Sequence, residues 1–185
     1  MRKISWQAAL GLLATGIAAS AFLMTAGPAS AATTAPATAA PTVHTAALTW
    51  PLVQSGNTGE RVFAVQYLLN QRIGAGLATD GIFGAKTKAA VQAFQKKEKL
   101  PVDGIVGPMT WPKLIVTVKS GSKGQAVSAV QHNLRFSYGF KTLAVDGIFG
   151  AKTEAAVKSF QAKFKVTADG IVGTTTWNAL IVHEK

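Results

Sequence analysis

Two stretches of the chain carry the same helical spacing of apolar residues. Val62, Val65 and Leu69 stand three and four positions apart, which places them on one face of a helix. The same spacing recurs 65 residues later, at Val127, Val130 and Leu134. The pattern therefore predicts two equivalent amphipathic helices.

A second and a third helix are expected after each of these. Ala90, Val91 and Phe94 fall on one face of a helix that begins near Gly84. Their counterparts after Gly150 are Ala156, Val157 and Phe160. A short third helix is expected over 107–115 and again over 173–181. The predicted fold class is all-α, with two tandem bundles of three helices, each near the lower size for independent folding.

The two units are copies of one another. Residues 80–111 and 146–177 are identical at 22 of 32 positions without a gap. A duplication this close indicates two copies of one folding unit. Residues 116–120 alone join them, so we expect the copies to lie side by side with limited freedom.

The beginning of the chain differs in composition from the repeats. Arg2 and Lys3, an apolar run over 8–24 and small residues around 28–32 predict a secretory signal peptide over 1–31. An uncleaved anchor is disfavoured because the run is short for a span of about 20 residues. Residues 32–49, rich in Ala, Thr and Pro and without formal charge, predict a disordered linker. The domains are then expected over 50–116 and 117–185.

A short motif, Asp-Gly-Ile-x-Gly, occurs twice in each copy and is followed three residues later by Thr. Asp can bond its own backbone two residues on, and Gly accepts positive φ, so the motif predicts a tight turn that leads into a helix. Ile82, Phe83, Ile105 and Val106 are expected to fill the core from these loops. The predicted structural turn residues are Asp80, Gly81, Gly84, Asp103, Gly104, Gly107, Asp146, Gly147, Gly150, Asp169, Gly170 and Gly173.

The order of these motifs resembles a known family. A Val-x-x-Val-Gln-x-x-Leu helix precedes Asp-Gly-x-x-Gly-x-x-Thr, then Ala-x-x-x-Phe-Gln and a second Asp-Gly-x-x-Gly-x-x-Thr-Trp. This combination resembles the bacterial peptidoglycan-binding domain of the three-helix type, over 53–115 and 118–181. Pro112, where the second copy has Asn178, departs from the pattern. A proline fits only the first turn of a helix, so this helix is expected to begin late.

The resemblance implies a secreted cell-wall protein that binds peptidoglycan, either its glycan or its stem peptides. Two tandem modules would add avidity, because the second contact becomes intramolecular. An alternative of another class is an adaptor or regulator that docks on a cell-wall hydrolase.

No catalytic set is shared by the copies. His44, His132 and His183 are not duplicated, the chain has no cysteine, and it contains no Gly-x-Ser-x-Gly nucleophile elbow. The acids common to both copies are the four turn aspartates. We therefore expect no catalytic residue, no metal site, no cofactor and no enzymatic activity. His132 is interpreted as a helix-surface residue.

The net charge of +11 favours binding to polyanions, among them anionic wall polymers. The charge is spread over both copies and no helix carries a base-reading set, so a nucleic-acid partner is not expected. Without cysteine the chain cannot carry a disulfide or a cysteine-linked lipid. We expect an extracellular or wall-associated monomer with no stable membrane insertion after the signal is cleaved.

Ligand contacts are expected among residues that both copies share and that suit sugar faces or carboxylates. The alternatives are core packing for the aromatic residues, local hydrogen bonding for the threonines and solvated charge for the lysines. The expected site is a shallow groove beside the first Asp-Gly turn of each copy. The candidates are Phe83, Lys86, Thr87, Gln95, Trp111, Phe149, Lys152, Thr153, Gln161 and Trp177.

Overall fold

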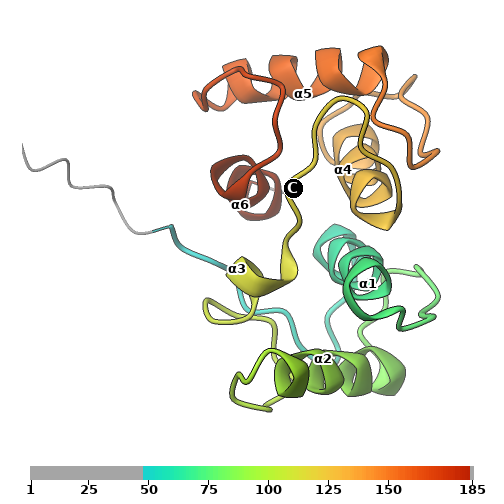
Figure 1. Ribbon diagram of the computed structural model, residues 1–185, viewed down its shortest axis with the longest axis vertical. Helices are drawn as coiled ribbons and strands as arrows, with labels where there is room; N and C mark the ends of the chain where they lie inside the picture. Colours follow the sequence, from blue (N-terminus) through green and yellow to red (C-terminus); the bar gives the residue numbers. More distant parts are fainter. Residues whose placement is uncertain (1–47, 184–185) are drawn as a thin grey trace, which may run out of the picture. The chain divides into compact units, whose positions relative to one another are not determined.

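The computed structural model describes residues 48–183, which form six α-helices and no β-strand within that range (Figure 1). Module 1 contains α1 (Glu60–Ile73), α2 (Ala85–Lys97) and α3 (Trp111–Leu114). Module 2 contains α4 (Gln125–Phe136), α5 (Ala151–Lys163) and α6 (Thr174–Val182). The prediction of an all-α chain with two three-helix units is confirmed.

The predicted signal peptide over 1–31 and all but the last two residues of the predicted linker over 32–49 lie outside the described residues. In the part that the structure does describe, no helix is both long enough and apolar enough to span a bilayer.

Each module is built around one tryptophan and two phenylalanines. In module 1, Trp111, Phe83 and Phe94 are at most 1% exposed and pack with the apolar face of α1. Module 2 uses the equivalent residues in the same way, namely Trp177, Phe149 and Phe160. The Nε1 atom of each tryptophan still finds an acceptor, which is Pro51 O for Trp111 and Val116 O for Trp177. The large rings are therefore buried without an unsatisfied indole donor.

An extended segment before α1 joins the two turns of module 1. Val53 and Val106 exchange two backbone hydrogen bonds, of 3.0 and 2.8 Å. Six residues further on, Gly59 N donates to Gly81 O at 2.9 Å. The segment before α4 repeats this arrangement, with isolated bridges from Val118 to Val172 and from Lys123 to Ile148. These bridges, which the sequence pattern did not predict, hold both Asp-Gly turns against the start of the first helix.

The third helices differ in length between the modules. Helix α6 begins directly after Gly173, whereas α3 begins only at Trp111 and has four residues. Trp111 N still donates to Gly107 O at 2.9 Å, but Pro112 has no backbone N–H to donate to residue 108, so the α-helical ladder is interrupted there. The expected late start of this helix is confirmed.

The modules contact each other through α1 and α4, which run antiparallel (Figure 1). Glu60, at the start of α1, lies 2.7 Å from His132 near the end of α4. Gln71, near the end of α1, accepts a hydrogen bond of 3.4 Å from Ala126 N. Tyr67 and His132 are equivalent positions, and their ring centroids lie 5.8 Å apart. The two modules are therefore related by an approximate two-fold axis between these helices.

His132 is consequently not the plain helix-surface residue that was expected. Its ring stacks on Phe63 of α1 at 4.3 Å and contacts Phe136 at 4.5 Å. The side chain is 12% exposed. An imidazole that covers one aromatic ring and approaches one carboxylate is part of the contact between the modules.

Candidate functional site

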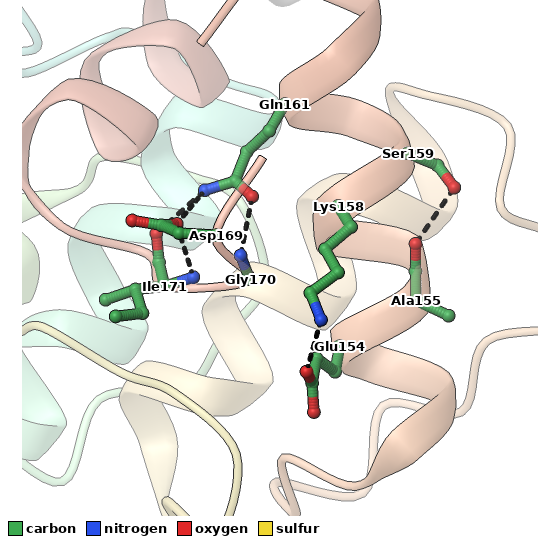
Figure 2. A network of polar contacts seen from close by, with 8 residues as sticks. All are labelled: Glu154, Ala155, Lys158, Ser159, Gln161, Asp169, Gly170 and Ile171. Carbon is green, nitrogen blue, oxygen red and sulfur yellow. Dashed lines mark hydrogen bonds and ion pairs between the residues drawn. The ribbon is translucent and has the colours of Figure 1, made fainter. Parts of the chain in front are cut away.

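Four buried glutamines organise the four Asp-Gly turns. Figure 2 shows one of them, Gln161 of α5, reaching the turn at Asp169. Its Nε2 donates to Asp169 Oδ1 at 2.8 Å and to Ile171 O at 2.9 Å, while its Oε1 accepts from Gly170 N at 2.9 Å. One amide thus satisfies three groups of the turn.

The same bonds recur at the other three turns. Gln66 serves the turn at Asp80, Gln95 that at Asp103, and Gln131 that at Asp146, with Nε2–Oδ1 distances of 2.7, 2.7 and 2.8 Å. In each case the threonine seven residues after the aspartate donates its hydroxyl to the isoleucine carbonyl. Each first or second helix of a module therefore positions one turn through a single glutamine.

The turn aspartates are held in the ionised form. At Asp80, the side-chain hydrogen bond from Gln66 and then the N–H of Ile82 lower the pKa of the carboxyl group. At Asp103, Asp146 and Asp169, the backbone N–H of the following isoleucine is the larger cause of the lowered pKa, and the glutamine is the second. Each turn thus presents a carboxylate at the surface at neutral pH.

Glycine is required at the second position of each motif. Gly81, Gly104, Gly147 and Gly170 have φ between 71° and 76°, in the left-handed region that side chains disfavour. At Gly81 a Cβ would in addition clash with the ring of Phe63, the residue that stacks on His132. The first turn of module 1 therefore rests directly on the contact between the modules.

The isoleucines of the motif do not all fill the core as expected. Ile82, Ile148 and Ile171 are 56%, 50% and 37% exposed, whereas the next residues, Phe83, Phe149 and Val172, are buried. The interpretation of Ile82 as a core residue is wrong because neighbouring residues in an extended loop point in opposite directions. Each of these three turns exposes an apolar side chain next to its carboxylate, and Ile105 is half-buried.

Shallow hollows lie beside the first turn of module 1 and beside the second turns of both modules. At the first turn of module 1 the hollow measures about 210 Å³ and is lined by Leu77, Asp80, Ile82 and Lys86, among others. Equivalent hollows at the second turns measure about 180 Å³ in module 1 and about 310 Å³ in module 2. Each combines an ionised carboxylate with apolar surface, which suits a ligand that carries both N–H donors and methyl groups or sugar faces.

Of the ten candidate contacts, eight are buried. The aromatic candidates lie in the module cores, and the polar ones are bonded to the turns. Thr87 and Gln95 nevertheless line the hollows beside Asp80 and Asp103. Lys86 and Lys152 are exposed at the start of α2 and α5. The buried candidates are Phe83, Thr87, Gln95, Trp111, Phe149, Thr153, Gln161 and Trp177.

The sequence reasoning missed the exposed isoleucines and the role of the glutamines. Each Asp-Gly turn is preceded by a glutamine in the helix before it, and this recurrence could have indicated a shared structural role for the glutamines. In the described residues, no three His, Cys, Asp or Glu side chains gather as a metal site would require.

Comparison with known protein families gives two matches along the chain. The family described as "Putative peptidoglycan binding domain" matches residues 58–114 and 123–180. The matched stretches contain all four turns and their glutamines.

Three similar proteins illustrate the relationship. The N-acetylmuramoyl-L-alanine amidase CwlL of Bacillus licheniformis is 34% identical over 163 residues, which covers 69% of this chain and 44% of the amidase. The zinc D-Ala-D-Ala carboxypeptidase of Streptomyces albus G is 39% identical over 117 residues, which covers 63% of this chain and 43% of the carboxypeptidase. The crystal structure of a peptidoglycan-binding protein from Clostridioides difficile is 45% identical over 35% of this chain and 40% of its own, with a TM-score of 0.34.

These relatives contradict the expectation that the chain has no enzymatic activity, because two of them are named as enzymes, an amidase and a carboxypeptidase. The chain spans less than half of their length. The matching region is the one that holds the peptidoglycan-binding domains, so the similarity identifies no catalytic residue here.

Proposed function

This chain belongs to the peptidoglycan-binding domain family, with two domains along its length, and we propose that it binds bacterial cell-wall peptidoglycan with both modules at once. The observation that carries the proposal is the set of residues beside the first Asp-Gly turn, most of which are exposed. It is the same in both modules, residue by residue. The matching pairs are Leu77 and Leu143, Ala78 and Ala144, Asp80 and Asp146, Ile82 and Ile148, Ala85 and Ala151, and Lys86 and Lys152.

This lining offers three kinds of contact within one small hollow. The carboxylate of Asp80 accepts from an amide or ammonium group, and the ammonium group of Lys86 pairs with a carboxylate. The exposed Ile82 packs on a methyl group or on the apolar face of a sugar. Peptidoglycan presents all three partners, because its stem peptides carry amides, methyl groups and carboxylates beside the glycan.

Two weak sites on one polymer network reinforce each other. Once the first module is bound, the second meets its ligand at a high effective concentration, which can raise the apparent affinity by about 10²-fold or more. The packing of α1 on α4 fixes the spacing of the two sites, so little orientational freedom is lost on binding.

The test is sedimentation of the full chain with purified sacculi from which anionic polymers have been stripped. We expect Lys86→Glu or Lys152→Glu alone to weaken retention and the double variant to abolish most of it. The matched control is Lys113→Glu with Lys141→Glu, which makes the same charge change at exposed lysines outside these hollows. Equal losses in the two double variants would reduce the binding to general charge attraction and refute the proposal.

A second candidate role comes from the named relatives. Since similar domains form part of an amidase and a carboxypeptidase, we propose that wall binding serves to place a wall-cutting activity. The activity would reside either in the same polypeptide or in a partner. Co-purification after digestion of the wall with lysozyme, followed by a sacculus-solubilisation assay, tests this role. A preparation with neither a hydrolase partner nor solubilising activity would contradict it.

Export is part of the proposal. The sequence of the first 31 residues supports a cleaved secretory signal. N-terminal sequencing of the protein from the culture medium or the wall fraction should begin at Ala32, and a protein that retains Met1 would contradict the cleavage.

A further inference from the structure

The hollows at the second Asp-Gly turns have the same frame in both modules but a different lining. Both frames consist of a glutamine, an ionised aspartate and a buried threonine with the same hydrogen bonds. The surface residues that surround them have changed in chemical type. Leu52, Pro101, Pro108 and Met109 of module 1 stand where module 2 has Thr117, Thr167, Thr174 and Thr175.

Apolar residues are unusually exposed around the hollow of module 1. Leu52 and Met109 are each 62% exposed, and the neighbouring Val102 is 52% exposed. Large side chains left this open are characteristic of a surface that binds another molecule. The same positions in module 2 carry hydroxyl groups or, at residue 168, a small alanine.

Leu52 also narrows the hollow of module 1. Its Cδ2 atom lies so close to Gly107 that a Cβ on this glycine would stand 2.8 Å from it. At Gly173, the equivalent position of module 2, a Cβ would meet nothing within 4 Å. The volumes agree with this difference, since they are about 180 Å³ beside Asp103 and about 310 Å³ beside Asp169.

The two hollows differ in volume and in the chemistry of their lining, so they suit different ligand groups. A hollow of about 180 Å³ is smaller than the usual ligand pocket and suits one small alkyl side chain, whereas about 310 Å³ reaches the lower end of that range. The apolar rim around Asp103 favours a methyl group next to an N–H donor. The hydroxyl groups of Thr167, Thr174 and Thr175 around Asp169 favour a ring that carries several hydroxyl groups.

We propose that the two modules recognise different parts of the wall at these second turns. Module 1 binds an alanine-bearing peptide segment beside Asp103, and module 2 binds a sugar ring of the glycan beside Asp169. This inference rests on the proposed binding to peptidoglycan. It makes Leu52 and Met109 specificity-determining residues of module 1, and Thr174 and Thr175 those of module 2.

The test uses the full chain and two soluble probes, the dipeptide D-alanyl-D-alanine and the sugar oligomer chitotetraose. Amide chemical shifts are followed by NMR during each titration. We expect the dipeptide to move the signals of Met109 and Thr110, and the oligosaccharide to move those of Thr174–Thr176. The double variant Leu52→Thr and Met109→Thr should bind the dipeptide roughly tenfold more weakly and bind the oligosaccharide as before. Leu48→Thr is the control, because Leu48 is exposed but lies outside the hollow.

Two outcomes would overturn the inference. In the first, both probes shift the amide signals of the same hollow. In the second, neither probe shifts the signals of either hollow up to its solubility limit. Sedimentation of the same variants with stripped sacculi separates this failure from failure of the proposed function. If the chain is retained on sacculi but the two probes give no selective chemical-shift changes, only the proposal of different ligands for the two modules is refuted. If the unsubstituted chain is not retained on sacculi, wall binding itself is refuted.

Discussion

The Nδ1 atom of His132 lies 2.7 Å from Glu60 Oε2, across the contact between the two modules. The same imidazole stacks on Phe63, so a polar contact and an aromatic contact meet at one residue of α4. The side chains of His132 and Glu60 are only 12% and 20% exposed, which limits screening by solvent.

We predict that Glu60 and His132 are energetically coupled. A double-mutant cycle with Glu60→Gln and His132→Ala, measured by urea unfolding, should give a coupling free energy of about 1 kcal/mol. Lys158 and Glu154 form the control pair, because they lie one helical turn apart and are more exposed. Their coupling should be clearly smaller, because solvent screens an exposed ion pair. A coupling at Glu60 and His132 no larger than this would show that the modules do not depend on the pair.

Gly81→Ala should destabilise the protein more than Gly139→Ala. Both glycines have positive φ, 71° and 82°, so each substitution carries a backbone cost of about 1–2 kcal/mol. A Cβ at Gly139 enters open space, whereas at Gly81 it meets the ring of Phe63. That ring is held by His132 and cannot move without loosening the module contact. Thermal unfolding of both variants measures the difference, and equal melting temperatures would contradict the predicted clash.

Acid should destabilise the modules through the turn aspartates. In the folded protein the pKa values of these carboxyl groups lie below the ordinary value of an aspartate. The stability that they contribute is therefore fully present above about pH 4 and is lost as the pH falls through the lower folded pKa. Asp103→Asn and Asp146→Asn should lower the urea midpoint at neutral pH and flatten its decline in acid. A decline that is unchanged in these variants would place the acid sensitivity elsewhere.

Asn133→Leu should stabilise module 2. Asn133 is 1% exposed, and its Oδ1 atom is buried without a hydrogen-bond partner. The equivalent residue of module 1 is the buried Leu68, which shows that the fold accepts leucine there. Removing the unsatisfied acceptor should gain about 1–2 kcal/mol in urea unfolding. The reciprocal variant, Leu68→Asn, should lose at least as much, and a loss in both variants would contradict this account.

Much of the fold could be predicted from the sequence because the same pattern occurs in both copies. The spacing of Val62, Val65 and Leu69, and its recurrence in the second copy, indicated helices that the structure contains. Pro112 correctly indicated a late third helix, since the loss of a backbone donor is a local effect.

The module contact did not follow from the sequence, because it depends on residues that the copies do not share. Glu60 aligns with Gln125 and Phe63 with Ser128. A comparison of the two copies identifies residues that both share. It therefore does not identify a contact between the copies that is made by residues found in only one of them. The exposed isoleucines were missed for another reason, since the direction of a side chain in a loop is set by backbone dihedral angles that no periodicity reveals.

The antiparallel packing of α1 on α4 has a geometric consequence for a wall made of directional strands. A two-fold rotation has no translation along its axis and reverses every direction perpendicular to it. A straight strand that runs past the molecule cannot contact the two equivalent first turns, at Asp80 and Asp146, with the same polarity. Equivalent contacts at both turns therefore require two strands or one strand that folds back, so the protein would hold neighbouring strands together instead of lying along one.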